Sequence, residues 1–167
     1  VKPNETPFYF GTCYENINYS YGLGLSIIGI KSAPADNILK IPTEAYGYKI
    51  KKIDSLYSDD WTHTDIKEIY LPDTVKSING YAFESMWGLE YIDLNMVEEL
   101  GAHSLMDCSA DLKVAINPKN TSICYKNDVI YNGDMTKIKC ITSATSSPII
   151  EPTVKTVHNK DLVYYRY

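Results

Sequence analysis

The sequence has few of the residues from which metal sites, redox sites and disulfide frameworks are built. Its three histidines, His63, His103 and His158, are far apart, and no His-x-x-x-His or Cys-x-x-Cys spacing occurs. We therefore expect no metal site and no cofactor. Four cysteines in 167 residues are too few for a disulfide-dense small domain. A single bridge between Cys124 and Cys140 stays open beside the alternative that all four cysteines are small buried hydrophobes.

The sequence also lacks a long apolar run. Its longest, Leu23 to Ile30, is interrupted by glycine and serine, whereas a membrane-spanning helix needs roughly 18 to 20 consecutive apolar residues. We expect a buried strand there and no membrane-spanning segment. The chain begins at Val1 without an apolar leader, and we expect any leader peptide or surface anchor to lie outside this chain.

A surplus of positive charge is absent as well. Sixteen basic against 21 acidic residues give a net charge of −5, which repels phosphate backbones and argues against a nucleic-acid partner. The apolar fraction of 44% beside 22% charged residues is typical of a soluble globular protein. A chain of 167 residues favours a single structural unit.

What the sequence does contain is a repeat. Two copies of 22 to 23 residues run from Ile66 to Leu89 and from Leu89 to Leu112. Most of the matched positions place an apolar residue on an apolar residue, so we expect a module that recurs in the structure. The matched pairs are Ile69 with Ile92, Leu71 with Leu94, Val75 with Val97, Ile78 with Leu100, Ala82 with Ser104, Phe83 with Leu105, and Met86 with Cys108.

Weaker copies flank these two. Upstream, Ile41-Pro42 corresponds to Leu71-Pro72, and Ile50 and Ile53 keep the three-residue step of the module, with a polar and aromatic insertion at 44–48 between them. Downstream, a further copy keeps the offsets of the module's apolar positions. Its residues are Ile150, Val154, Val157 and Leu162.

The spacing within a module predicts a short strand followed by a tight return. Ile69 and Leu71 alternate with Tyr70 at a period of two, as in a strand with one buried face. Pro72-Asp73 then ends the strand. The three-residue step from Val75 to Ile78 and the pair Ala82-Phe83 favour a tight helical or irregular return segment. One such coil cannot bury its own apolar face, so we expect a β-rich solenoid with short parallel strands stacked coil on coil.

Three further expectations concern the ends of the solenoid. Residues 1–37 are expected to be N-terminal strands that cap the first coil, because an open end exposes core. The solenoid is expected to occupy residues 38–167 within one structural unit. A β-hairpin is expected as an insertion near 123–141, because Asn132-Gly133 separates two strand-like runs.

The module has the form IxxIxLPxxVxxIxxxAFxxMxxL over residues 66–89, and it resembles the BspA-like leucine-rich-repeat family of bacterial cell-surface proteins. The segment NDVIYNGDMTKI at 127–138 is similar to one with which members of that family interrupt their coils. The resemblance implies a leucine-rich-repeat solenoid that is secreted or attached to the cell surface and takes part in adhesion and protein binding. The second copy departs from the motif, with Asn95-Met96 where proline is expected.

The sequence therefore favours a non-enzymatic, extracellular or cell-surface binding module. Fifteen tyrosines are many for this length, and tyrosine supplies contact area for proteins and for sugars. The strand positions expected to face outward are Glu68, Tyr70, Tyr91 and Asp93, which form the candidate partner-binding face. We expect a protein partner, such as a host matrix protein or another surface protein, or a glycan. The alternative is a purely structural spacer within a larger cell-surface protein.

Three local patterns allow other interpretations. Asp59-Asp60 beside Trp61 could hold a sugar or a cation, although a solvated loop is the simpler interpretation. Cys108 with His103 could act as a nucleophile, although Cys108 occupies a core position of the module. Asn120-Thr121-Ser122 is one of three matches to the glycosylation acceptor pattern, a pattern that is common by chance.

Overall fold

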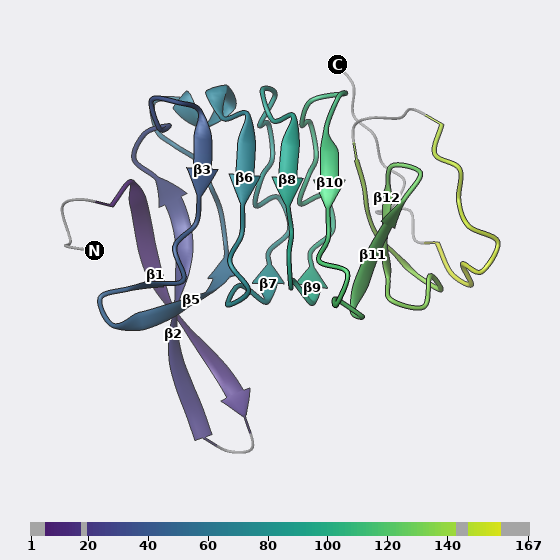
Figure 1. The fold of residues 1–167 in the computed structure, drawn as a ribbon, viewed down its shortest axis with the longest axis horizontal. Helices are drawn as coiled ribbons and strands as arrows, with labels where there is room; N and C mark the ends of the chain where they lie inside the picture. The colour runs from purple at the N-terminus through teal and green to yellow at the C-terminus, as the bar shows by residue number, and fades with distance from the viewer. Residues whose placement is uncertain (1–5, 18–19, 143–146, 158–167) are drawn as a thin grey trace.

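The computed structural model describes residues 6–17, 20–142 and 147–157, and over these it is a β-solenoid of about four turns with almost no helix. Short strands succeed one another along the molecule, and the ribbon winds from coil to coil (Figure 1). In the part of the chain that is described, the only helix is the 3-10 helix η1 (Thr62–Asp65). The solenoid architecture expected from the repeat is therefore confirmed.

A first ladder of parallel strands runs along one side of the solenoid. It has the order β10-β8-β6-β3 and is formed by β3 (Ile38–Lys40), β6 (Glu68–Tyr70), β8 (Tyr91–Asp93) and β10 (Lys113–Ala115). The inward residue of each strand stacks in register on that of the next, because Leu39 pairs with Ile69, Ile69 with Ile92 and Ile92 with Val114. These are the strands that the period-two pattern predicts, and Figure 1 shows them side by side.

A second parallel ladder was not expected from the sequence. It consists of β2 (Ser20–Ile30), β5 (Tyr48–Ile53), β7 (Ser77–Ile78) and β9 (Glu99–Leu100). The sequence predicted helical or irregular structure around Ile78. Two residues are too few to show the alternation of a strand, so β7 and β9 are recognised only by their pairing with the neighbouring coil.

Strands near the N-terminus extend the second ladder. The strand β1 (Phe8–Ile17) pairs antiparallel with β2, and β2 pairs parallel with β5. The insertion at 44–48 forms β4 (Glu44–Ala45), which folds back on β5. The first ladder has no such extension beyond β3 among the described residues, so β3 is its edge strand.

The return segments form a third side made of stacked turns. Successive turns are joined by backbone hydrogen bonds, from Leu56 N to Ala82 O at 2.9 Å and from Phe83 N to Ser104 O at 2.9 Å. Several turn residues have positive φ, among them Tyr81 at 62° and His103 at 60°. These segments are therefore irregular turns, and the bonds between them replace those that a helix would make within itself.

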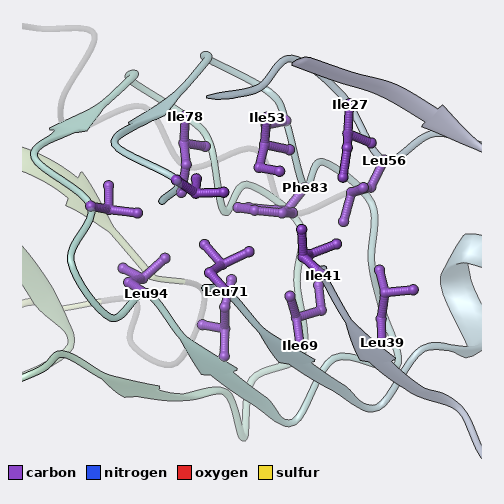
Figure 2. Close-up of a cluster of buried hydrophobic side chains, with 14 of the residues drawn as sticks. Ile27, Leu39, Ile41, Ile53, Leu56, Ile69, Leu71, Ile78, Phe83 and Leu94 are labelled. Atoms are coloured by element: carbon purple, nitrogen blue, oxygen red, sulfur yellow. The ribbon is translucent and has the colours of Figure 1, made fainter. Parts of the chain in front are cut away.

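The core is one continuous column between the two ladders. Figure 2 shows Ile27, Ile53 and Ile78 from the second ladder opposite Ile69 and the leucines of the first, with Phe83 between the two rows. Leu71 and Leu94 are 4% and 0% exposed, and the backbone N of Leu71 donates to Asp93 O in the next coil at 3.1 Å. The predicted sharing of one core by neighbouring coils is confirmed.

The segment near 123–141 is a three-stranded antiparallel sheet. Its strands are β11 (Ile123–Lys126), β12 (Val129–Asn132) and β13 (Ile138–Ile141). The tight turn lies between β11 and β12, where Asn127 and Asp128 have φ of 51° and 62°. Asn132-Gly133 begins the longer loop to β13, so the expected hairpin is present with an additional strand before it.

The expected downstream copy of the module is only partly followed by the structure. Ile150 and Val154 pack against a small cluster around Val129, Tyr131 and Ile138. Val157 is 42% exposed, so it does not occupy a core position as its offset predicted. Leu162 lies outside the described residues.

None of the four cysteines, all of which are described, forms a disulfide. Cys124 and Cys140 lie on β11 and β13, which are separated by β12. Cys140 belongs to the main core, whereas Cys124 packs against the cluster around Tyr131. The bridge that the sequence left open is not formed, because the two side chains face opposite sides of the sheet.

Candidate functional site

The outward positions of the first ladder form one continuous surface, which we call the strand face. Each strand contributes the two residues that flank its inward central residue, which is buried in β3, β6 and β8 and partly buried in β10. Parallel in-register pairing brings equivalent positions about 4.8 Å apart. The predicted residues all lie on this face and are half-buried. In register, one row is Ile38, Glu68, Tyr91 and Lys113, and the other row is Lys40, Tyr70, Asp93 and Ala115.

Two tyrosines meet at the centre of the strand face. The ring centroids of Tyr70 and Tyr91 are 5.4 Å apart, and the ring planes are inclined by 43°. Because each ring is partly covered by the other, both present a fixed edge and face to solvent. Exposed lysines flank the pair, Lys40 on β3 and Lys113 on β10.

The two carboxylates of the strand face are held by neighbours. The Tyr70 hydroxyl donates to Glu68 Oε2 at 2.6 Å, and the backbone N of Asn95 donates to Asp93 Oδ1 at 2.9 Å. The hydrogen bond to Glu68, together with burial and the nearby negative charges, raises the pKa of Tyr70 to about 12. Burial and then the charges of Asp93 and Glu68 raise the pKa of Tyr91. Both phenols therefore remain protonated donors at neutral pH.

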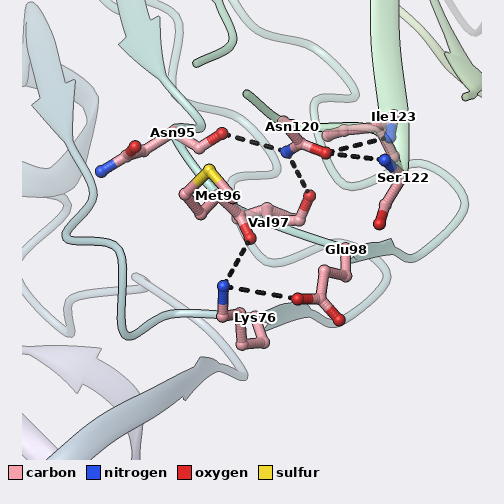
Figure 3. Close-up of polar contacts among 8 residues, drawn as sticks. All are labelled: Lys76, Asn95, Met96, Val97, Glu98, Asn120, Ser122 and Ile123. Carbon is pink, nitrogen blue, oxygen red and sulfur yellow. Dashed lines mark hydrogen bonds and ion pairs between the residues drawn. The ribbon is translucent and has the colours of Figure 1, made fainter. Parts of the chain in front are cut away.

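Asparagine side chains in the turns after β8 and β10 form hydrogen bonds between neighbouring coils of the strand face. Asn95 Nδ2 donates to Leu71 O in the preceding coil at 3.0 Å, and Asn117 Nδ2 donates to Asn95 Oδ1 at 3.0 Å. Asn120 Nδ2 donates to the carbonyls of Asn95 and Val97, as Figure 3 shows. At position 95, where the motif has proline, asparagine therefore links adjacent coils through its amide.

Lys76, which directly precedes β7 of the second ladder, contacts the same region. Its Nζ lies 3.3 Å from Glu98 Oε1 and donates to Met96 O at 3.3 Å (Figure 3). Together with the asparagines, these contacts hold the strand face on a rigid support, so the side chains of β6 and β8 keep a fixed relative position.

The alternative interpretations of single residues are resolved by their surroundings. Cys108 is buried and its thiol donates to Phe83 O at 3.2 Å, and burial raises its pKa, so it is a core residue with a protonated thiol. His103 stacks on Tyr81 with ring centroids 5.3 Å apart. Asn120 uses its amide nitrogen within the fold, so it is not a free acceptor for a glycan.

Trp61 belongs to an aromatic group that the sequence only hinted at. Its ring contacts Tyr57 and His63, with centroid distances of 5.6 Å and 5.7 Å, and Tyr81 of the next coil lines the same cavity. Asp60 accepts hydrogen bonds from Thr62, which lower the pKa of its carboxyl and shape the turn. The sequence could not connect Tyr81 with Trp61, because only the stacking of coils brings them together.

Over the described residues, no group of three or more histidine, cysteine or acidic side chains is arranged to hold a metal ion. Within the same part of the chain, no helix has the length and apolarity needed to cross a membrane. Comparisons with protein-family models, with curated proteins and with solved structures found no match to this chain.

Proposed function

We propose that the protein is a non-enzymatic binding module that meets a protein or glycan partner on the strand face. The observation that carries this proposal is the contacting pair Tyr70 and Tyr91 at the centre of a regular, four-stranded ladder. Tyrosine pairs offer apolar rings and hydroxyl donors at a small cost in conformational entropy, as binding surfaces require. Glu68 pairs with Tyr91 and Asp93 with Tyr70, so a carboxylate stands beside each ring. These two carboxylates favour a partner that presents hydrogen-bond donors.

We further propose that the solenoid is of the leucine-rich-repeat type and resembles the BspA-like family, with a place outside the cell or on its surface. The support is the coincidence of sequence repeat and structural coil, since Ile69 stacks on Ile92 and Ile78 on Leu100. An adhesion role follows from the same resemblance and stands on that alone.

A structural spacer is the second candidate. It is favoured by the continuous core and by the asparagine contacts between coils, which together make a stiff rod. A spacer needs this stiffness but does not need the tyrosines and carboxylates of the strand face. The two functions therefore differ in whether the strand face contributes to the affinity for a partner.

The test replaces Tyr70 and Tyr91 by alanine together. Partners are first sought with immobilised matrix proteins and a glycan array, and the affinity of the variant is then measured by surface plasmon resonance. We expect a loss of roughly tenfold or more, because the tyrosine pair is the centre of the contact. The melting temperature should fall by only a few degrees, since both rings are half-buried.

Tyr48→Ala is the matched control, because Tyr48 is 44% exposed and lies on β5, away from the first ladder. Its affinity should equal that of the parent chain. Equal capture by the double variant and by Tyr48→Ala would refute the binding function of the strand face and favour the spacer.

A further inference from the structure

A cavity of about 280 Å³ lies where η1 and its preceding loop meet the return turn of the next coil. Its size is close to that of pockets that hold one small ligand unit. It uses none of the strand-face residues. The lining residues are Ser55, Tyr57, Trp61, His63, Tyr81, Ala82, Glu84 and Ser85.

Three aromatic side chains of the cavity are open to solvent. Tyr57, Trp61 and Tyr81 are 48%, 53% and 52% exposed. Tyr57 and Trp61 make an edge contact at 5.6 Å, and each ring also contacts the His63 imidazole. Exposed large aromatic rings gathered at one concave place are typical of ligand stacking surfaces.

The His63 side chain provides a buried hydrogen-bond donor in this cavity. The residue is 1% exposed, and its Nδ1 accepts from the backbone N of Ser58 at 3.2 Å and contacts Ser58 Oγ at 2.9 Å. A ring nitrogen that accepts from a backbone N–H carries no proton, so the neutral imidazole has its proton on Nε2. Among the described residues Nε2 has no hydrogen-bond partner, which is an unfavourable state for a buried donor.

The charges around the cavity limit the ligands that fit. The carboxylates of Glu84 in the lining and of Asp60 near His63 disfavour an anion. The unpartnered Nε2–H requires an acceptor, which a simple cation does not have. A neutral polyol with an apolar ring face satisfies both conditions, because its hydroxyls donate to a carboxylate and accept from an imidazole.

We propose that this cavity is a carbohydrate-binding site for a neutral sugar residue. The sugar ring packs against Trp61 and Tyr81, and one of its oxygens accepts from His63 Nε2–H. The Tyr57 and Trp61 rings both contact the imidazole, so in this proposal the half-exposed Trp61 ring rotates outward for a sugar oxygen to reach Nε2. A hydroxyl of the sugar donates to Glu84. The site is independent of the function proposed for the strand face.

The protein's two tryptophans allow a direct test. In the full chain carrying Trp87→Phe, Trp61 is the only tryptophan, so its fluorescence reports on the cavity. A glycan array of neutral oligosaccharides built from hexoses and N-acetylhexosamines identifies bound sugars, and each is then titrated while Trp61 emission is recorded. We expect a saturable change of Trp61 emission with at least one neutral oligosaccharide.

Variants separate this site from the rest of the surface. Trp61→Ala and Tyr81→Ala should each weaken sugar binding by roughly tenfold or more on the array. His63→Asn should also weaken it, because asparagine can still accept from Ser58 but lacks the Nε2 donor. Trp87→Ala is the matched control, since Trp87 is 61% exposed and does not line the cavity. It should bind the sugar as the parent chain does.

The Tyr70 and Tyr91 double alanine variant should also keep sugar binding, so failure of one proposal is distinguishable from failure of the other. The absence of any bound neutral oligosaccharide would overturn the proposal. So would sugar binding that Trp61→Ala and Tyr81→Ala leave unchanged. A fluorescence response to tetramethylammonium chloride without a response to sugars would assign the cavity to a cation instead and would equally overturn it.

Discussion

The side chain of Asn120 joins the last regular coils to the three-stranded sheet. Its Nδ2 donates to Asn95 O at 3.0 Å and to Val97 O at 2.7 Å (Figure 3). Its Oδ1 accepts from the backbone N of Ser122 at 2.9 Å and of Ile123 at 3.3 Å. One amide therefore satisfies four backbone groups from two parts of the chain.

Replacement of Asn120 by alanine should lower the free energy of unfolding by about 2 to 4 kcal/mol, because partly buried backbone groups lose their partners. Urea denaturation followed by circular dichroism measures the loss. Lys119→Ala is the control, because Lys119 is exposed and its side chain has no such role. Equal stability of the two variants would contradict the bridging role of Asn120.

His63 gives the stability a dependence on pH. Burial lowers its pKa below the ordinary value of 6.5, although the charge of Asp60 opposes this shift. The unfolded chain therefore binds a proton more readily than the folded chain. The contribution of neutral His63 is complete above about pH 6.5 and is lost as the pH falls from there to the lower folded pKa.

We expect the melting temperature of the parent chain to fall more steeply between pH 7 and pH 5 than that of His63→Asn. Nuclear magnetic resonance of the imidazole protons should give a His63 pKa below 6.5. Calorimetry at several pH values measures the melting temperatures of both proteins. Parallel pH profiles of the two proteins, or a His63 pKa above 6.5, would contradict this account of its burial.

At the scale of the elements, the second ladder depends on how closely neighbouring coils approach. Gly101 directly follows β9 and lies against Gly80, which follows β7 one coil earlier. A Cβ at Gly101 would stand 2.2 Å from Gly80 N, and backbone atoms cannot move away as a side chain can. The glycine pair therefore sets the distance between these two coils.

Gly101→Ala should lower the free energy of unfolding by about 2 to 4 kcal/mol, because the coils must separate to admit the methyl group. Gly47→Ala is the matched control. Gly47 has a φ of +79°, and among the described residues no atom lies within 4 Å of an added Cβ, so its cost is limited to backbone strain of about 1 kcal/mol. A smaller loss at Gly101 than at Gly47, measured by urea denaturation, would contradict the close approach.

At the scale of the whole molecule, the core links the solenoid to the three-stranded sheet. Ile130 of β12 is fully buried in the same cluster as the coil residues, together with Ile123 and Cys140. In a solenoid, each unit is stabilised in part by its interfaces with the neighbouring units. The sheet and the coils are therefore expected to unfold together.

Ile130→Ala should lower the unfolding midpoint of the coils as well as that of the sheet. The expected cost is about 2 to 5 kcal/mol, as for other large-to-small changes in a core. Tryptophan fluorescence reports on the coils, because Trp61 and Trp87 both lie there, and circular dichroism reports on the whole chain. A fluorescence midpoint unchanged by Ile130→Ala would show that the coils unfold independently.

Much of the solenoid could be predicted from the sequence. Repeated apolar positions such as Ile69 and Ile92 predicted both the strands of the first ladder and their stacking, since a coil cannot bury its apolar face alone. The same alternation placed Glu68, Tyr70, Tyr91 and Asp93 on the outward side. These features depend on local periodicity, which a single sequence displays.

Other features were decided only by the tertiary structure. The strands β7 and β9 are too short to show a pattern and exist through pairing between coils. The contact of Tyr70 with Tyr91 and the cavity shared by Trp61 and Tyr81 join residues that are about one coil apart in sequence. The sequence by itself determined which residues are buried within each coil, while the register of one coil on the next determined which exposed residues meet. Register depends on contacts between coils, such as those of Asn95 and Gly101, and no local pattern contains them.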